Sequence, residues 1–223
     1  MSQSKSPLLV RQRGTAVAAA LFAVVLAGCG GSASPSAGGG GGRTTAPTPA
    51  GGTGQNAAAA QSPVPAESNP PGDIPDTTVY VTYQSPAGHL AFKVPEGWSR
   101  KSMPTRSTFT SNLNSISVAW MPMTGAPTAR SARATTVRAL HAATLAFRLQ
   151  TVRTVTLAGG PAVEIVYQVN SAPNPVTGRQ YRLVIERFEF YHKGQGAVLS
   201  LSSAVGSDNV DPWRIVSESF RWA

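Results

Sequence analysis

The sequence predicts an α+β domain in which helices cover both faces of a central antiparallel sheet, an α/β/α sandwich. Three observations predict it. Apolar and polar residues alternate in several segments of the second half of the chain, which indicates strands with one buried face. Turn sequences rich in Gly, Pro and Asn separate the last of these segments, which favours an antiparallel meander. Two further segments repeat apolar residues at helical spacing.

The composition limits the kinds of site that the chain can build. Its 223 residues include 19 Lys and Arg against 10 Asp and Glu, a formal charge of +9, and a single cysteine. One cysteine excludes an intrachain disulfide and any metal site with several cysteine ligands. The length allows one or two domains. No run of about 18 apolar residues follows the first 30, so no later membrane-spanning helix is expected.

The N-terminus has the pattern of an export signal. Residues 1–14 carry three basic side chains and no acid, and residues 15–27 are almost wholly apolar. This run is too short to cross a bilayer, which favours a signal peptide over an anchor. It ends in Leu26-Ala27-Gly28-Cys29, which resembles the lipobox of bacterial lipoproteins, where small residues precede a cysteine that accepts diacylglycerol. We therefore expect a signal peptide over 1–28 and a lipid anchor at Cys29, with an ordinary cleavage site beside a free thiol as the alternative.

The anchor would place the protein on the outer face of the plasma membrane, in the bacterial cell envelope. Two or more acyl chains make such attachment effectively stable. The segment from 29 to 75 then serves as a tether. Of residues 30–75, 11 are Gly and 8 are Pro, and hardly any large apolar side chain is available to bury. A core cannot offset the entropy of ordering such a chain, so we expect a disordered linker.

The folded domain is expected over 76–223. Its fourth alternating segment changes phase, because Phe188 and Phe190 fall on the face opposite to Ile185. This predicts either a β-bulge near Glu186 or a strand buried on both faces. Turns are expected at 159–161, 174–178 and 194–196. The alternating apolar residues, segment by segment, are Leu90, Phe92 and Val94; Ile116, Val118 and Trp120; Val163, Ile165, Tyr167 and Val169; Tyr181, Leu183 and Ile185; and Ala197, Leu199 and Leu201.

Two helices are expected to cover this sheet. The first lies within 129–150, which lacks Gly and Pro and repeats apolar or small residues at Val137, Leu140, Thr144 and Phe147. The second closes the chain, with Asp211 as N-cap and proline at the first helical position. Its apolar stripe is Trp213, Val216 and Phe220. Because the whole meander separates the two helices, they can cover opposite faces.

These elements together resemble a known family. The resemblance rests on Phe92-x-Val94-Pro95-x-Gly97-Trp98, the central helix, the Gly-Gly-Pro turn, the meander, and Asp208-x-x-Asp211-x-Trp213 before Ser219-Phe220. The pattern is similar to the PsbP/Mog1-like fold, and most of all to actinobacterial lipoproteins of the LpqN type, over about residues 79 to 223. The resemblance implies an α/β/α sandwich. It also implies a mostly non-enzymatic accessory or binding protein, in a lipoprotein branch that is linked to envelope glycolipids.

No motif indicates catalysis, a cofactor or a metal site. The sequence has no nucleophile elbow, no His-Glu-x-x-His, no phosphate loop and no dinucleotide fingerprint. Glu186 and Glu189 are three apart on a strand and so face opposite sides. Asp208 and Asp211 are better explained as helix caps than as a metal loop, since the closing glutamate of a calcium loop is missing. We expect no enzyme, although a hydrolase with a dispersed triad stays open as an alternative.

Two surfaces are candidates for binding. From residue 76 onward the chain has 15 basic and 8 acidic residues. The predicted central helix contains four arginines and no acidic residue: Arg130, Arg133, Arg138 and Arg148. This pattern favours contact with an anionic surface or, equally, a solvated helix face. The exported location makes nucleic acid an improbable partner. A candidate apolar cleft is formed by Trp98, Trp120, Met121 and Met123, with plain core filling as the alternative.

Two functions follow from these patterns. The first is a membrane-tethered protein that binds an envelope lipid or glycolipid, or assists its transport. The second is an interaction module that docks on another envelope protein. An apolar internal cavity would favour the first, whereas a filled core with an exposed aromatic patch would favour the second.

Overall fold

The computed structural model describes residues 61–68 and 72–223. All of them belong to one compact unit, Ala46–Ala223. The predicted signal peptide, its cleavage site Leu26-Ala27-Gly28, the lipidation site Cys29 and most of the predicted tether lie outside the described residues. Within the described part, no helix has the length and apolar character that a membrane span requires.

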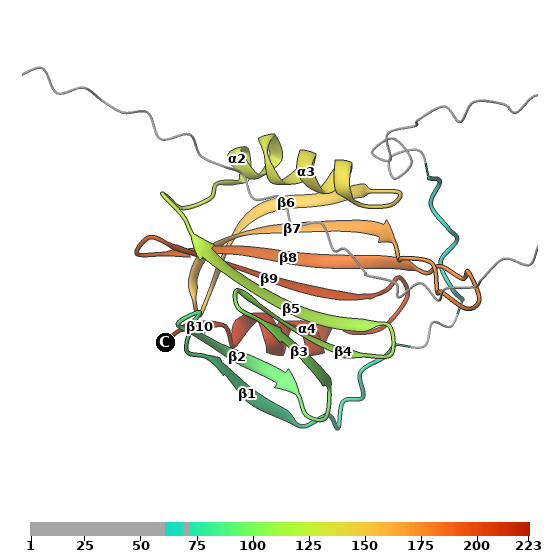
Figure 1. Cartoon of the computed structure of the whole chain (residues 1–223), viewed down its shortest axis with the longest axis horizontal. Helices are drawn as coiled ribbons and strands as arrows, with labels where there is room; N and C mark the ends of the chain where they lie inside the picture. Colours follow the sequence, from blue (N-terminus) through green and yellow to red (C-terminus); the bar gives the residue numbers. More distant parts are fainter. Residues whose placement is uncertain (1–60, 69–71) are drawn as a thin grey trace, which may run out of the picture. The chain divides into compact units, whose positions relative to one another are not determined.

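Two antiparallel sheets and the helices packed on them build the domain (Figure 1). The larger sheet has seven strands in the order β3-β4-β5-β9-β8-β7-β6, and the smaller has three in the order β1-β2-β10. The larger sheet contains β3 (Ser99–Met103), β4 (Arg106–Ser111), β5 (Asn114–Pro122), β6 (Arg148–Leu157), β7 (Gly160–Asn170), β8 (Arg182–His192) and β9 (Gln195–Ala204). The smaller contains β1 (Tyr80–Ser85), β2 (Leu90–Pro95) and β10 (Arg221–Trp222), and the helices are α2 (Ala129–Ala134), α3 (Thr136–Ala143) and α4 (Val210–Glu218).

The predicted meander is confirmed. Strands β6, β7, β8 and β9 are neighbours in the sheet in chain order and all pair antiparallel. The connections lie at the predicted turns, and Gly160, Gly178 and Gly194 adopt the positive φ angles that favour glycine.

The predicted α/β/α sandwich is also confirmed, because the two faces of the large sheet carry different layers (Figure 1). Adjacent residues of β7 show this: Ala162 belongs to the hydrophobic cluster under α4, and Val163 to the cluster under α2 and α3. The cluster under α4 contains 17 buried residues and is shared with the small sheet, whereas the other contains seven. The main core therefore lies on the α4 side.

The change of phase in β8 reflects burial on both faces and not a bulge. Its pairing with β7 and β9 runs without interruption from Leu183 to Phe190. Ile185 packs under α2 and α3, while Phe188 and Phe190 pack under α4. The strand is thus covered by one layer near its start and by the other near its end.

The predicted helix over 129–150 is wrong in its extent. It is broken at Thr135, whose hydroxyl donates to the Ser131 carbonyl (2.8 Å), and it ends at Ala143 before Thr144. Threonine competes in this way with the helical backbone, which favours a break. Residues 148–150 belong to β6, so Arg148 lies on a strand.

The C-terminal helix begins two residues earlier than predicted. Its N-cap is Asn209, not Asp211, and the Asn209 side chain makes no capping bond. Instead its amide binds a segment near the N-terminal end of the domain, accepting from Ile74 N (2.8 Å) and donating to Gly72 O (2.9 Å). Phe220 lies beyond the helix, after Ser219, yet it is fully buried as expected.

Five strands lie outside the alternating segments found in the sequence: β1, β3, β4, β6 and β10, of which β6 was implied only by the turn at 159–161. Every residue of β3 is exposed, so this strand has no buried face and no alternation to detect. The short β10 exists only because it pairs with β2. These strands are defined by their partners in the sheets and not by a local pattern.

The end of the predicted tether is part of the folded structure. Residues 61–68, which we call the strap, bind the loop between β7 and β8, and Ile74 is buried in the main core. The Asn170 amide accepts from Val64 N (3.1 Å) and donates to Ser62 O (2.8 Å). Residues 61–68 and Ile74, which were expected to belong to the tether, therefore contact the domain. Side-chain amides that satisfy the backbone of an irregular segment hold it without regular structure.

Candidate functional site

The four residues of the predicted apolar cleft do not form one cavity. Trp120 is 8% exposed in the main core, and Met121, the next residue on the strand, points to the opposite face of the sheet. Met123 packs on Gly196, where an added Cβ would collide with its sulfur. Trp98 contacts Trp213 edge to face, with 6.3 Å between ring centroids. The structure therefore places these four residues in different surroundings, and ligand binding by any of them stays a prediction.

A groove of about 340 Å³ does include Trp98, and we call it the aromatic groove. It lies between the small sheet and the β3–β4 edge of the large one, and it is open to solvent. Tyr83 bridges the two sheets: its ring packs edge to face on Phe109 at 5.0 Å, and its hydroxyl lies 2.8 Å from Ser107 Oγ. The Arg100 guanidinium lies 6.0 Å from the same ring. An aromatic floor with a basic rim suits an extended, partly acidic chain.

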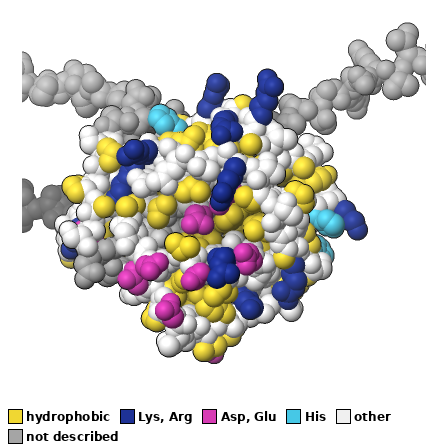
Figure 2. Space-filling view, turned by 180° about the vertical axis from the view of Figure 1, so that it is seen from behind, with side chains coloured by type: hydrophobic (Ala, Val, Ile, Leu, Met, Phe, Trp, Pro, Cys, Tyr) yellow, Lys and Arg dark blue, Asp and Glu magenta, His cyan; other side chains and the backbone are white. Residues whose placement is uncertain are grey.

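A second groove of about 360 Å³, the glutamate groove, lies between α4 and strands β6–β8. Glu164 and Glu186 point into it from neighbouring strands, and Arg153 forms an ion pair with Glu164. Figure 2 shows this side of the molecule, where acidic and basic side chains gather over a hydrophobic surface. Sequence reasoning missed this pair, because Glu164 and Glu186 become neighbours only through strand register.

The glutamate groove favours a protonated carboxyl. Burial raises the pKa of Glu186 above its ordinary value, and the negative charge of Glu164 raises it further, while Arg153 lowers it. Ser217 also lines the groove, but its hydroxyl bonds the carbonyl of Arg214. The arrangement is an ion pair beside one protonatable group, and it places no nucleophile next to a base.

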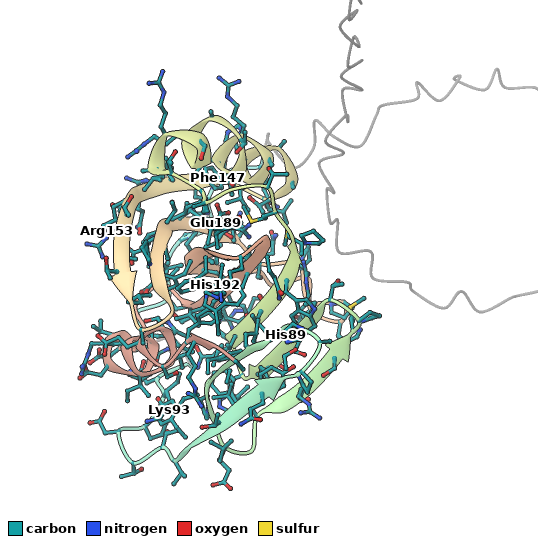
Figure 3. All side chains as sticks on the ribbon, turned by 90° about the vertical axis from the view of Figure 1, so that its left-hand side faces the viewer. His89, Lys93, Phe147, Arg153, Glu189 and His192 are labelled. Atoms are coloured by element: carbon teal, nitrogen blue, oxygen red, sulfur yellow. The ribbon has the colours of Figure 1, made fainter. Side chains whose placement is uncertain are left out.

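The three histidines occupy separate environments. His89 lies in the turn between β1 and β2, His141 packs on Phe147 at 5.6 Å, and His192 stacks on Trp222 at 5.6 Å. Figure 3 shows His89 and His192 apart from Phe147, which lies beneath the helices. Over residues 61–68 and 72–223, no three His, Cys, Asp or Glu side chains are grouped to hold a metal ion.

The predicted basic surface is partly assembled. Arg130, Arg133 and Arg138 are exposed on α2 and α3, and Arg148 is exposed at the start of β6. Arg133 also donates to the carbonyl of Val152 in β6 (2.8 Å). The helical layer is basic because the stretch of chain that contains it has no acidic residue. From residue 97 to residue 163 the chain has eight Arg and Lys and not one Asp or Glu.

The acid-free run forms β3, β4 and β5 at one edge of the large sheet, β6 at the opposite edge, and both helices of the layer that contains α2 and α3. On the helices, neighbouring arginines have no carboxylate at i±3 or i±4 to neutralise them. The positive charge therefore stays uncompensated within the helical layer.

The comparisons with known proteins identify structural neighbours only. No protein-family profile matches the sequence, and no curated protein matches it. The chain is similar to the Ran-binding protein Mog1p of Saccharomyces cerevisiae (12% identity, TM-score 0.46, covering 66% of this chain and 96% of that one). It is also similar to cyanobacterial PsbP (CyanoP) from Synechocystis sp. PCC 6803 (15% identity, TM-score 0.49, covering 68% and 98%).

The PsbP/Mog1-like fold, which the sequence resembles, is named after these two proteins. Identities this low bear on the fold alone. The finer resemblance, to lipoproteins of the LpqN type, stays a prediction.

Proposed function

We propose that the chain is a non-catalytic binding module of the bacterial cell envelope, tethered by acyl chains on Cys29, whose helical layer contacts an anionic surface. The observation that carries the proposal is the acid-free run from 97 to 163, which leaves Arg130 and Arg138 exposed without a neighbouring acid. Each basic residue near an anionic membrane contributes about 1 kcal/mol of attraction. An envelope lipid or glycolipid would then be bound through its anionic head group and not within an apolar cavity.

The tether and the surface complement each other physically. An acyl anchor confines the domain near the lipid head groups, which raises its effective concentration there. Weak electrostatic attraction is then enough to orient the domain. Such attraction acts within a Debye length of about 8 Å at physiological salt, so it needs the anchor to be maintained.

Vesicle binding tests the surface separately from the anchor. The full chain carrying Cys29→Ala should bind phosphatidylcholine vesicles that contain phosphatidylglycerol, and the binding should weaken as salt rises. Removing two charges with Arg130→Gln and Arg138→Gln should weaken it roughly 30-fold, since about 2 kcal/mol is lost. The control is Lys93→Gln with Lys101→Gln, which removes the same charge from exposed positions on β2 and β3. Equal losses from both double variants would show only a general charge effect.

Fractionation tests the anchor. In the native host, Cys29→Ala should move the chain out of the membrane fraction without loss of folding. An unchanged membrane fraction at unchanged yield would remove the lipoprotein proposal.

A second candidate function is docking on another envelope protein through the aromatic groove. The favouring observation is that β3 and β1 are edge strands and both line this groove. An extended segment can add to such an edge and place side chains on Tyr83 and Trp98. Crosslinking in intact cells from a photoreactive residue at Met103, which is 57% exposed, should then capture a defined envelope protein. Capture should fail when Trp98→Ala is introduced.

A further inference from the structure

A buried cation that has no carboxylate partner within residues 61–68 and 72–223 lies at the start of β8. Arg182 is 4% exposed. Its Nη1 donates to the carbonyl of Ala146 (2.7 Å) and to Asn170 Oδ1 (3.1 Å), both of them neutral acceptors. Its Nη2 is buried and has no hydrogen-bond partner among the described residues. A charge taken out of water costs several kcal/mol unless it is paired, so an arginine in this state is unusual.

The charged neighbour of Arg182 is another cation, Arg148. Burial lowers the pKa of Arg182 from its ordinary value, and the neighbouring Arg148 lowers it further. Arg182 has no ion pair within 4 Å in the described part of the chain, whereas Arg153, Arg179 and Arg187 each have one and Arg214 has two. Two arginines that repel each other, one of them with a free donor, form a place where an anion is stabilised.

The strap is bonded to Asn170, which also bonds Arg182. Asn170 Oδ1 accepts at once from Arg182 and from the strap's Val64 N (3.1 Å), so the strap and the arginine share one partner. The strap is further held by Asn170 Nδ2, by Gln180, which receives a bond from Gln61 (3.0 Å), and by the Glu67–Arg179 ion pair (2.7 Å). These bonds are part-buried or exposed, and an exposed ion pair contributes little. Releasing the strap therefore costs far less than unfolding the domain.

We propose that Arg182, Arg148 and Asn170 form a binding site for a phosphate group, and that the strap occupies this site when no phosphate is bound. Strap release would free the Asn170 amide and uncover Arg182 Nη2. A phosphate has several acceptor oxygens, and these suit donors that come from different elements, here β6, β7 and β8. The inference deepens the proposed function, because it gives the anionic partner of the module a defined chemical group.

The first experiment measures binding of inorganic phosphate to the full chain carrying Cys29→Ala. At low millimolar concentration, phosphate should raise the melting temperature more than sodium chloride at the same ionic strength, and the difference should follow the mass-action binding of a single site, whereas general exclusion of phosphate from the surface grows only in proportion to its concentration. Arg182→Gln should abolish this difference. Lys101→Gln, which removes the same charge from an exposed position on β3, should retain it. A phosphate effect that survives Arg182→Gln would overturn the proposal.

The second experiment decides the case if Arg182→Gln fails to fold through loss of its bond to Ala146. Gln61→Ala with Glu67→Gln loosens the strap and leaves the three site residues intact. Because the closed strap competes with phosphate, the apparent phosphate affinity should rise by about tenfold. The matched control is Gln84→Ala with Glu96→Gln, which makes the same two changes at exposed positions on β1 and just after β2. An unchanged affinity in the loosened variant would show that Arg182 merely fastens the loop at Ala146.

The source of the phosphate is found by comparing two ligands. Hydrogen exchange of residues 61–68 should accelerate when the strap is released, either with inorganic phosphate or with phosphatidylcholine vesicles that contain phosphatidate. Acceleration with vesicles at a lower phosphate concentration identifies a lipid head group, and acceleration with both equally identifies a free phosphate. Acceleration with neither overturns the site, while vesicle binding that depends on Arg130 and Arg138 would leave the proposed function standing.

Discussion

The two faces of the large sheet differ in both packing and charge. The face under α4 carries the larger aromatic core, in which Phe190 and Phe220 stack at 4.1 Å, and beside it lie Glu164 and Glu186. The face under α2 and α3 carries a smaller core, and its outer layer has arginines and no acid. Strands alternate their side chains between faces, so one sheet can maintain two such environments. Most of the buried packing that stabilises the domain therefore lies on the α4 face, and the arginines proposed to bind an anionic partner lie on the other face.

The largest expected effect is on the α4 face. Phe220→Ala removes a fully buried ring and should lower the free energy of unfolding by about 3–5 kcal/mol. The matched change on the other face, Val137→Ala at a partly buried position of α3, should cost about 1 kcal/mol. Urea denaturation measures both. Deleting residues 212–223 should leave no cooperative transition, and similar losses from the two point variants would contradict the comparison.

Gly159 tests how tightly the α4 face is packed. A Cβ at this position would lie 2.5 Å from the Phe220 ring and 3.1 Å from the Phe220 carbonyl oxygen. Gly159→Ala should therefore destabilise the domain by about 1–3 kcal/mol through overpacking. The control is Gly125→Ala in the loop before α2, where an added Cβ meets nothing within 4 Å. Thermal unfolding that is unchanged in Gly159→Ala would show that the C-terminal segment can shift.

Two glutamates on the same strand should respond in opposite ways to removal of their charge. Glu189, on the α2–α3 face, accepts from Arg187 at 2.9 Å and from Thr136 at 3.4 Å. Glu189→Gln should thus destabilise the domain by about 1–3 kcal/mol at pH 7. Glu186→Gln, on the α4 face, should stabilise it at pH 7, because burial disfavours the charged form of Glu186.

The pH dependence of unfolding distinguishes the Glu186 effect from a packing effect. The folded-state pKa of Glu186 is raised, so the folded protein binds more protons than the unfolded chain, whose Glu pKa is about 4.3. The contribution of Glu186 to the free energy of unfolding is complete below its unfolded-state pKa and is lost as the pH rises through its folded-state pKa. The advantage of Glu186→Gln over the parent should therefore grow from pH 4 to pH 8. An advantage that is constant with pH would exclude this cause.

The smallest expected effect is on the basic surface. Arg130→Gln and Arg138→Gln remove exposed charges that belong to neither hydrophobic cluster, so each should change stability by less than about 0.5 kcal/mol. Denaturation of the same double variant that is used for vesicle binding measures this. A large loss of stability would mean that these arginines stabilise the fold. Their proposed role in binding an anionic surface would then be weakened.

Sequence patterns predicted the parts of the fold that a strong local period specifies. The meander was predictable because Val163, Ile165 and Tyr167 alternate under a helical layer and because glycine turns separate the strands. The helix break at Thr135 was not, since no Gly or Pro marks it in the sequence. Of the candidate site, exposed arginines were predictable from composition. The buried Arg182 was not, because nothing in its local sequence distinguishes it from the exposed Arg179.

The sequence by itself determined the layered sheet, the buried C-terminal anchors and the excess of positive charge, because burial periodicity and composition are local properties of the chain. Only the tertiary structure decided which side chains meet. It brought Glu164 beside Glu186 through strand register, and it placed Asn170 between Arg182, 12 residues away in the chain, and the strap's Val64, 106 residues away. The physical reason is that hydrogen bonds and ion pairs depend on distances in space, and no periodicity of the sequence encodes those distances.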